Sequence, residues 1–465
     1  MRLDKAIDDL QADLVAAVQE AVRIRSVKEV EQAAPGAPFG PGIRKALDWF
    51  LALGERLGFT VKDVDGYAGY VELGSGELFG ILGHLDVVPE GDGWTVPPYE
   101  GLIKEGKIYG RGAVDDKGPT LAALFAMKVL KDSGLPLTRR VRLIAGTDEE
   151  SGWADMAHYA AKEEVPACGF APDAEFPVIH AEKGILHLEL SKPVKELPHL
   201  VLVDGGVRPN MVPDKCRVHL SGLEQTLVAS LLQSFDFPGG VHAELLPGDG
   251  RMAEFVVHGI GAHGSLPERG KNAVLYALSF LQALPLHEGE LELLQWLLAY
   301  PGKGWHGEGF GLALQDEPSG KMSVNVGMLH LEAGQLSCVL DIRYPVTFRP
   351  KDVLDPIERQ ARIAGFKTKV VLAQAPHHVP QDSALVQGLL RAYHEVSGRE
   401  AYAFAIGGGT YAKVMPQGVA FGPSFPGEPE LVHCPDEYIT INNLLLTAKI
   451  YAQALVHLAT GEAGA

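Results

Sequence analysis

The sequence contains few cysteines and no long apolar run. Its four cysteines, Cys168, Cys216, Cys338 and Cys434, lie far apart among 465 residues and form no CxxC pair. This spacing argues against a disulfide framework or a zinc knuckle and fits a reducing cytoplasm. No apolar stretch approaches the roughly 20 residues that span a bilayer. The first 25 residues mix acidic and basic side chains and lack the apolar region of a secretory signal, so we expect a cytoplasmic protein.

Basic charge is also scarce. Lys and Arg total 41 against 59 Asp and Glu, which gives a formal net charge of -18, and the basic residues form no block. Such a field repels phosphate backbones and anionic lipids, so neither nucleic acid nor membrane is an expected partner. Hydrophobic residues make up 46% of the chain, which is typical of a globular protein. The length exceeds what one core requires, so we expect two or more packed units.

The order of expected elements divides the chain into three segments. Helical periodicity over residues 7–22, 46–57 and 121–130 surrounds apolar strands at 78–82 and 141–145, which predicts an α/β sheet flanked by helices. From about residue 186, amphipathic strands at 217–220, 254–258, 323–330 and 338–344 predict an inserted α+β unit with helices at 227–235 and 272–284. Helix and strand then alternate again. We therefore expect a catalytic domain at 1–185 and 380–465, and an inserted lid domain at 186–379.

Polar side chains cluster where the apolar strands end, which is where open α/β sheets build ligand sites. In GHLDVVP, His84 and Asp86 are two positions apart, so on an extended chain they face the same side. A carboxylate so placed can orient a metal-bound imidazole. In YGRGAVDDKGP, Asp115 and Asp116 follow a glycine-rich loop and precede a helix. Each pair also has an ordinary interpretation, as a chance pair or as a helix cap.

Three further motifs add possible metal ligands. GTDEESG places Glu149 and Glu150 directly after the strand at 141–145, and crowded carboxylates at a strand end repel one another unless cations hold them. APDAEFPVIHAEKG contributes Asp173, and LVHCPDEYI contributes His433. An acidic triplet is often solvated surface, and a lone Asp or His is often structural. Together, however, the motifs supply the nitrogen and oxygen ligands that suit a pair of zinc or similar divalent ions.

These motifs also carry a family resemblance. GHLDVVPEGDGW, YGRGAVDDKGP, GTDEESGW and APDAEFPVIHAEKG occur in the order and at the spacing typical of peptidase V. The sequence therefore resembles the co-catalytic zinc hydrolases that include carboxypeptidase G, aminoacylases and succinyl-diaminopimelate desuccinylase, and within them the peptidase V and carnosinase branch. The resemblance covers essentially the whole chain. It implies a zinc-peptidase-like catalytic domain with a mixed central sheet, plus the inserted lid.

The resemblance implies a role for each matching residue. Asp115, rather than Asp116, would bridge two divalent metal ions, which we expect to be Zn²⁺, with Mn²⁺ or Co²⁺ as alternatives. Asp86 would support the histidine, and Glu149 would be the general base. The remaining metal ligands would be His84, Glu150, Asp173 and His433.

Four more positions match substrate-contacting residues. His263, in GIGAHGSLPERGKNA, resembles a lid histidine that polarises the scissile carbonyl, and Arg343, in LDIRYP, resembles an arginine that contacts substrate. Asn210, in RPNMVP, and Thr410, in GGGTYAK, are weaker matches. His263 could instead face solvent, and Arg343 could be a strand residue paired with Asp341 or Glu332. GGGTYAK lacks the spacing of a phosphate-binding loop.

The resemblance implies a monomeric dipeptidase that cleaves unblocked dipeptides, including β-alanyl ones, through a dizinc-activated water. The partner would then be a small peptide. One alternative is another amidohydrolase of the same family, namely an N-acyl amino acid deacylase, a desuccinylase or an exocarboxypeptidase. A second alternative, from a different class, is a non-catalytic protein that binds metal or peptide.

Overall fold

The structure is a computed structural model that describes residues 3–195, 197–247 and 252–460. The chain forms two compact units. Unit 1 comprises residues 1–180, 378–404 and 409–465, and unit 2 comprises residues 181–377 and 405–408. The expected boundaries were 185/186 and 379/380. The short return of residues 405–408 to unit 2 was not expected, because four residues are too few to carry a periodic pattern.

Unit 1 is built on a mixed sheet. Strand β3 (Glu77–His84) runs parallel to its two neighbours, β6 and β7, whereas β1 and β2 are antiparallel additions at one edge. The full strand order is β1 (Thr60–Val64), β2 (Ala68–Leu73), β6 (Arg139–Gly146), β3, β7 (Cys168–Ala171), β22 (Gln417–Ala420), β9 (Val178–Glu182) and β20 (His377–His378), with β21 (Ala403–Ile406) paired to β9. The chain passes between the two units within β9, β20 and β21. The parallel centre brings the carboxyl ends of β3, β6 and β7 to one edge.

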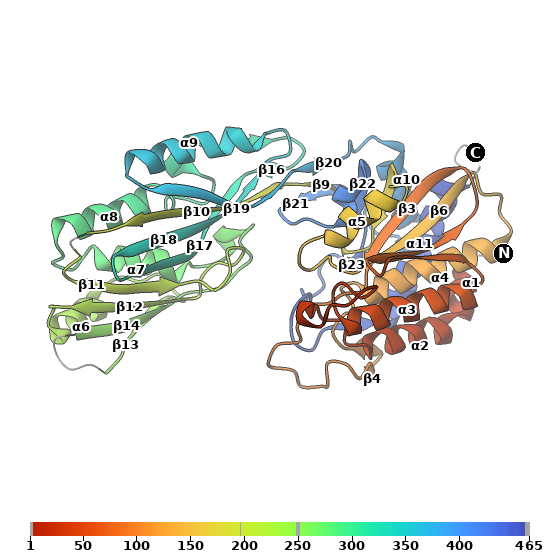
Figure 1. The fold of residues 1–465 in the computed structure, drawn as a ribbon, viewed down its shortest axis with the longest axis horizontal. Helices are drawn as coiled ribbons and strands as arrows, with labels where there is room; N and C mark the ends of the chain where they lie inside the picture. The colour runs from red at the N-terminus through yellow and green to blue at the C-terminus, as the bar shows by residue number, and fades with distance from the viewer. Residues whose placement is uncertain (1–2, 196, 248–251, 461–465) are drawn as a thin grey trace. The chain divides into compact units, whose positions relative to one another are not determined.

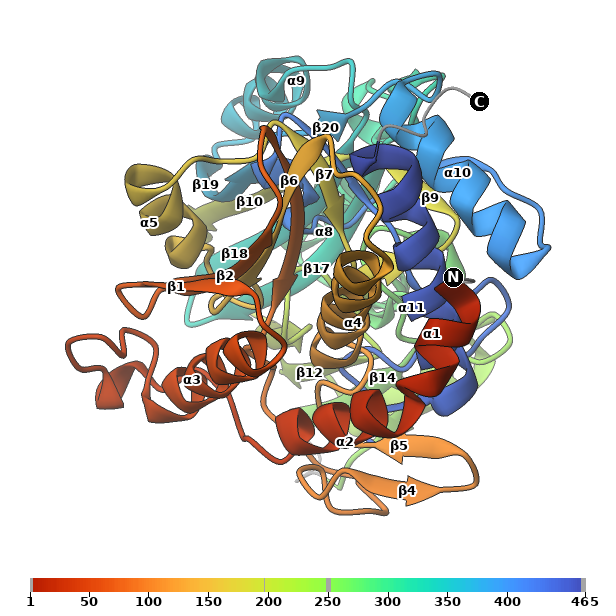
Figure 2. The same ribbon diagram turned by 90° about the vertical axis from the view of Figure 1, so that its right-hand side faces the viewer.

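Helices cover both faces of this sheet. Figure 2 shows the long helices α4 (Lys117–Ser133) and α11 (Ile441–Ala459) on one face and the short helix α5 (Ala154–Lys162) on the other. Successive side chains of the strands point to opposite faces. Leu143 of β6 packs with the residues of α4 and α11, and the next residue, Ile144, packs with those of α5. The other helices of unit 1 are α1 (Leu3–Asp9), α2 (Gln11–Val22), α3 (Pro41–Arg56) and α10 (Ala384–Ser397). The expected α/β domain with a mixed central sheet is confirmed.

Unit 2 contains an eight-stranded sheet in which every pairing is antiparallel. Four helices accompany it, α6 (Gln225–Ser234), α7 (Ala273–Leu281), α8 (Glu288–Ala299) and α9 (Pro350–Ile363), as Figure 1 shows. The strand order is β13 (His242–Leu245), β14 (Met252–His258), β12 (Lys215–Ser221), β11 (Leu200–Gly205), β17 (Ser323–Glu332), β18 (Gln335–Tyr344), β10 (Gly184–Pro193) and β19 (Lys367–Gln374). This is the expected α+β unit.

Short elements complete the fold. One small sheet joins β4 (Leu102–Lys104), β5 (Lys107–Tyr109) and β24 (Tyr438–Thr440). Two further pairs are β8 (Ala174–Glu175) with β23 (Pro423–Ser424), and β15 (Gln315–Asp316) with β16 (Gly320–Lys321). The 3-10 turns are η1 (Val30–Gln32), η2 (Pro267–Arg269), η3 (Glu308–Phe310) and η4 (Tyr411–Val414). Within the described residues, no helix combines the length and the apolar character needed to cross a membrane.

Candidate metal centre

The predicted ligands meet at the carboxyl edge of the parallel strands of unit 1. His84 is the last residue of β3, Glu149 and Glu150 follow β6, and Asp173 follows β7. Parallel neighbours end at the same edge, so these side chains come together. Asp115 reaches the same place from the loop before α4, and His433 reaches it from the segment before β24. All of these residues belong to unit 1.

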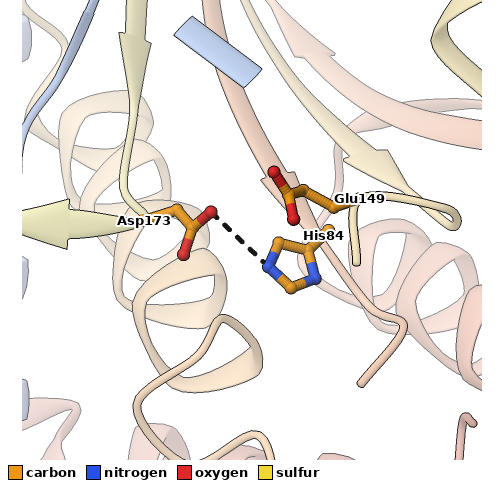
Figure 3. A group of neighbouring side chains, drawn as sticks. All are labelled: His84, Glu149 and Asp173. Carbon is orange, nitrogen blue, oxygen red and sulfur yellow. Dashed lines mark ion pairs between the residues drawn. The ribbon is translucent and has the colours of Figure 1, made fainter. Parts of the chain in front are cut away.

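Asp115 lies between two imidazoles. Its Oδ1 is 3.0 Å from Nε2 of His84, and its Oδ2 is 3.1 Å from Nε2 of His433. On the first side, His84 Nε2 is also 3.6 Å from Asp173 Oδ2, the contact dashed in Figure 3. On the second side, His433 Nε2 is 3.0 Å from Glu150 Oε2. The geometry therefore forms two half-sites, each with one imidazole and one terminal carboxylate, that share Asp115.

Glu149 lies on the His84 side of this centre. A carboxylate oxygen of Glu149 and donor atoms of His84 and Asp173 all lie within 4.8 Å of one another. The three side chains converge in Figure 3. Donor atoms of His84, Asp115 and Glu150 meet the same condition. The position of Glu149 is compatible with two roles, that of a metal ligand and that of an acid-base group next to the ligands.

Asp86 holds the centre in two ways. His84 Nδ1 donates to the main-chain oxygen of Asp86 at 2.9 Å, which leaves Nε2 turned toward Asp115 and Asp173. The Asp86 carboxylate is 3.5 Å from the same Nδ1, so it is not the closest support of the ring. That carboxylate instead accepts the backbone N–H groups of Glu149 at 3.2 Å and Glu150 at 3.1 Å. Asp86 thus fixes the end of β3 relative to the end of β6.

The electrostatics of the centre favour bound cations. Burial and the neighbouring Asp115 charge raise the pKa of Asp173 to about 7. Burial and the Asp173 charge also raise the pKa of Glu149 well above its usual value. Burial opposes the charge on His433, but Asp115 and Glu150 outweigh it and raise the pKa of His433 to about 11. Acids this crowded ionise together only when positive charge accompanies them, so this set of nitrogen and oxygen donors fits two divalent ions.

Glu437 is a residue of the centre that the sequence did not point to. It is fully buried, and its Oε1 accepts the backbone N–H groups of Gly112 at 3.0 Å, Val114 at 3.0 Å and Asp115 at 3.3 Å. Its Oε2 pairs with the buried Arg111 at 2.7 Å. Glu437 lies four residues after His433, so one side chain ties the segment that carries His433 to the loop that carries Asp115.

Asp116 and Thr410 lie beside the centre. Asp116 Oδ2 accepts the backbone N–H of His84 at 3.1 Å and the Thr120 hydroxyl at 2.9 Å, so this carboxylate faces away from the two-imidazole arrangement. Thr410 is buried, and its hydroxyl accepts the N–H of Ala412. The next residue, Tyr411, presents its ring edge to the His84 ring, with centroids 6.3 Å apart.

The other three predicted substrate residues come together inside unit 2. Met211 pairs with His263 in an isolated bridge, and the oxygen of Asn210 accepts the N–H of Gly264 at 2.7 Å. Ser265 N–H donates to His263 Nδ1 at 3.2 Å, so a neutral His263 ring carries its proton on Nε2. Arg343 is buried, with only 4% of its surface exposed, and pairs with Asp341 as the sequence allowed.

Three comparisons with known proteins show which family this chain is similar to. The model of Peptidase family M20/M25/M40 matches residues 80–457. The "Putative dipeptidase YtjP" of Bacillus subtilis (strain 168) is 42% identical over 96% of this chain and 97% of the relative. The "Putative dipeptidase" of Staphylococcus epidermidis (strain ATCC 12228 / FDA PCI 1200) is 35% identical over 96% of this chain and 97% of the relative. The crystal structure of human carnosine dipeptidase 1 has the same fold, with a TM-score of 0.56 at 18% identity over 98% of this chain and 97% of that one.

Proposed function

Because the chain belongs to peptidase family M20/M25/M40, we propose that it is a metal-dependent dipeptidase that hydrolyses unblocked dipeptides. The observation that carries the proposal is Asp115, whose two oxygens face the imidazoles of His84 and His433. The names of the two bacterial relatives support the substrate class. The predicted β-alanyl dipeptides belong to the same proposal.

The residues of the centre suggest how two ions would be held. In the proposal, His84 and Asp173 would hold one ion, His433 and Glu150 would hold the other, and Asp115 would serve both. Nitrogen and oxygen donors in this combination suit zinc, and they also accept Mn²⁺ or Co²⁺. Two such ions, when bound, lower the pKa of a water molecule and polarise a substrate carbonyl.

Glu149 moves the proton in this proposal. Its carboxylate accepts a proton from the attacking water and then donates it to the leaving amine, and burial and the Asp173 charge, which raise the pKa of Glu149, favour the proton-accepting step. Asp86 positions Glu149, because it accepts the backbone N–H of that residue. The same carboxylate positions Glu150, so base and ligand are fixed together.

Four residues recognise the peptide in the proposal. His263 donates from Nε2 to the scissile carbonyl oxygen, where negative charge develops during attack. Arg343 binds the carboxylate of the dipeptide, and Asn210 and Thr410 make polar contacts with the substrate. A free carboxylate and a planar guanidinium form paired, charge-assisted hydrogen bonds, which favours short peptides with an unblocked end.

Hydrolysis assays on metal-free and metal-reconstituted protein test the proposal. The chelated protein is assayed on Ala-Ala before and after addition of Zn²⁺, Mn²⁺ or Co²⁺. We expect activity to vanish on chelation and to return with at least one of these ions. N-acetyl-Ala-Ala and tetra-alanine serve as comparison substrates, and equal turnover of either would refute a preference for unblocked dipeptides.

The same assays separate the competing functions. Faster cleavage of N-acetyl amino acids or N-succinyl-diaminopimelate would identify a deacylase or a desuccinylase. Tight binding of Ala-Ala without turnover under every metal condition would identify a binding protein. The proposal includes a monomeric state and a cytoplasmic location, which sedimentation and cell fractionation test.

A further inference from the structure

Unit 2 contains a buried network that connects its three expected substrate residues. We define the Asp341 network as the residues joined by the contacts below, namely His187, Asn210, His263, Gly264, Ser265, Asp341, Arg343 and Gly407. All of them belong to unit 2, so the network is complete within that unit. Asp341 is 0% exposed, which makes it the most deeply buried charged member.

Asp341 and Arg343 form the centre of this network. Asp341 Oδ1 accepts from Arg343 Nε at 2.8 Å, and Oδ2 accepts from Nη2 at 2.9 Å, so the pair is bidentate. Nη1 of Arg343 donates to the oxygen of Gly407 at 2.7 Å. These contacts use three of the five N–H donors of the guanidinium and leave two for a ligand.

The network extends from this pair to the other two residues. A Cβ at Gly264 would lie 2.5 Å from Asp341 Oδ2, so the turn between His263 and Ser265 lies directly on the Asp341 carboxylate. A Cβ at Gly407 would lie 2.5 Å from the Ser265 Cβ, and Ser265 in turn orients His263. The backbone N–H of Gly264 also donates to the main-chain oxygen of Asn210. Asp341 therefore contacts Arg343 directly and packs against the turn that orients His263 and Asn210, the other two expected substrate residues of unit 2.

Asp341 is ionised in this setting. Burial opposes its charge, but His187 and Arg343 outweigh burial and hold the pKa of Asp341 below its usual value. His187 Nε2 lies 3.4 Å from Asp341 Oδ1, which places a second basic group on the same carboxylate. The ionised carboxylate gives Arg343 one fixed orientation, because a bidentate pair restricts the plane of the guanidinium.

We infer that Asp341 is a positioning residue that orients the Arg343 guanidinium toward the free carboxylate of the peptide and so selects substrates that carry one. The inference rests on the proposed function, in which Arg343 binds that carboxylate. Asp341 itself does not touch substrate. Its effect passes through the two remaining N–H donors of Arg343.

The test compares Ala-Ala with Ala-Ala amide, which lacks the carboxylate. For Asp341→Asn, we expect KM for Ala-Ala to rise at least roughly tenfold with kcat little changed, because uniform binding is lost. The ratio of kcat/KM between Ala-Ala and its amide should fall by the same factor. Bound metal, measured by elemental analysis, should stay at the wild-type level because no ligand is altered.

Glu290→Gln is the matched control. Glu290 is also 0% exposed in unit 2, and it accepts the N–H groups of His199 and Leu200 without joining the Asp341 network. The Glu290→Gln variant should be less stable than the wild type, but its ratio of kcat/KM between Ala-Ala and Ala-Ala amide should be unchanged. Arg343→Lys, which keeps the charge but not the bidentate pair, provides a second route if Asp341→Asn does not fold, and it should lower the same ratio.

The outcomes separate the inference from the function. Wild-type turnover of Ala-Ala combined with an unchanged ratio in a folded Asp341→Asn would overturn the inference and leave the proposed dipeptidase activity in place. An unchanged ratio in Arg343→Lys would overturn the inference together with the proposed role of Arg343. A wild-type protein that cleaves no dipeptide with any added ion would overturn both. A double variant whose ratio falls further than that of either single variant would show that the two residues act separately, against the inference.

Discussion

Asp115 faces one imidazole with each of its carboxylate oxygens, at 3.0 and 3.1 Å. A carboxylate that serves two half-sites must be held in one rotamer, and Asp115 is 7% exposed with its backbone N–H bound to Glu437. Burial opposes its charge, but His433 and His84 outweigh burial and hold the pKa of Asp115 well below its usual value. Asp115 is thus ready as an anion for both half-sites, whereas Glu149, on the His84 side, holds its proton more tightly.

Replacing Glu149 with glutamine tests this division of roles. Glu149→Gln keeps the shape of the side chain but removes its ability to accept a proton, so we expect kcat on Ala-Ala to fall by roughly 10²- to 10⁴-fold. Metal content, measured by elemental analysis, should match the wild type. Loss of one equivalent of metal would instead make Glu149 a ligand, which its position beside His84 and Asp173 also allows.

Metal uptake should release protons. The pKa of His433, raised to about 11 by Asp115 and Glu150 against the opposing effect of burial, means that the metal-free protein carries a protonated His433 at neutral pH. A cation must displace that proton, so apparent metal affinity should be lower at about pH 6 than at about pH 8. Calorimetric titration in buffers of different ionisation enthalpy counts the released protons. The His433→Ala variant should release fewer protons on metal binding than the wild type. An equal number of released protons would contradict a protonated His433 in the metal-free protein.

The convergence of the expected ligands could be predicted from sequence because most of them lie in motifs at strand ends. His84, Glu150 and Asp173 each follow an apolar run, and parallel strands bring such positions together. Glu437 could not be predicted in this way. Its partners are backbone N–H groups 322 to 325 positions away, and no periodicity or residue type marks them. Asp341 shares the face of Arg343 on β18, so their pairing was open to prediction, but its contact with Gly264 depends on how the loop folds.

Loops, more than regular elements, set the geometry of the centre. Strands β3, β6 and β7 supply the edge, but Asp115 and His433 come from irregular segments that Glu437 joins. The backbone contact between Gly110 N–H and Glu437 oxygen, at 2.9 Å, adds a second tie between the same segments. The relative position of the two loops therefore depends on one buried residue, Glu437, through its carboxylate and its main-chain oxygen.

Glu437→Gln should therefore disturb metal binding without altering a ligand. The amide cannot satisfy both Arg111 and the loop N–H groups, so we expect a loss of about 3 kcal/mol in the free energy of unfolding, as for a broken buried ion pair. Metal affinity, measured by competition with a chelating dye, should fall as well. Glu430→Gln, at an exposed glutamate of the same segment, is the control. Unchanged metal affinity in a destabilised Glu437→Gln would limit Glu437 to stability alone.

The regular elements followed from periodicity, with informative exceptions. The helix expected at 46–57 is α3 (Pro41–Arg56), and the strand expected at 338–344 is β18 (Gln335–Tyr344). Helix α9 was not predicted, because Pro350 and Pro356 resemble helix breakers. In the structure Pro350 opens the helix, where its missing N–H costs nothing, and the buried stripe of α9 contacts the core of unit 2. Strand β19 was also missed, since its mostly exposed side chains do not alternate.

The two units have separate cores. Among the described residues, each large group of buried apolar side chains lies within one unit, and every expected metal ligand lies in unit 1. Units with their own cores can unfold in separate steps. Metal binding should then stabilise only one of them, because an ion that binds the folded state adds its binding free energy to that state.

Scanning calorimetry with and without chelator measures this effect. We expect two transitions, of which one shifts to lower temperature by several degrees when metal is removed and the other does not move. The shifting transition should be the one that Glu437→Gln also lowers, and Glu290→Gln should lower the other. A single transition that shifts as a whole would show that the units unfold together.

Unit 2 is inserted between segments of unit 1, so the two units are not synthesised one after the other. Four of the five expected metal ligands are translated by residue 173, but His433 and the central strand β22 (Gln417–Ala420) emerge only after the whole of residues 181–377. The nascent chain can finish most of the second unit while β7 is paired only with β3 and still lacks β22. The expected two-ion centre therefore cannot be completed before residue 433 has been translated.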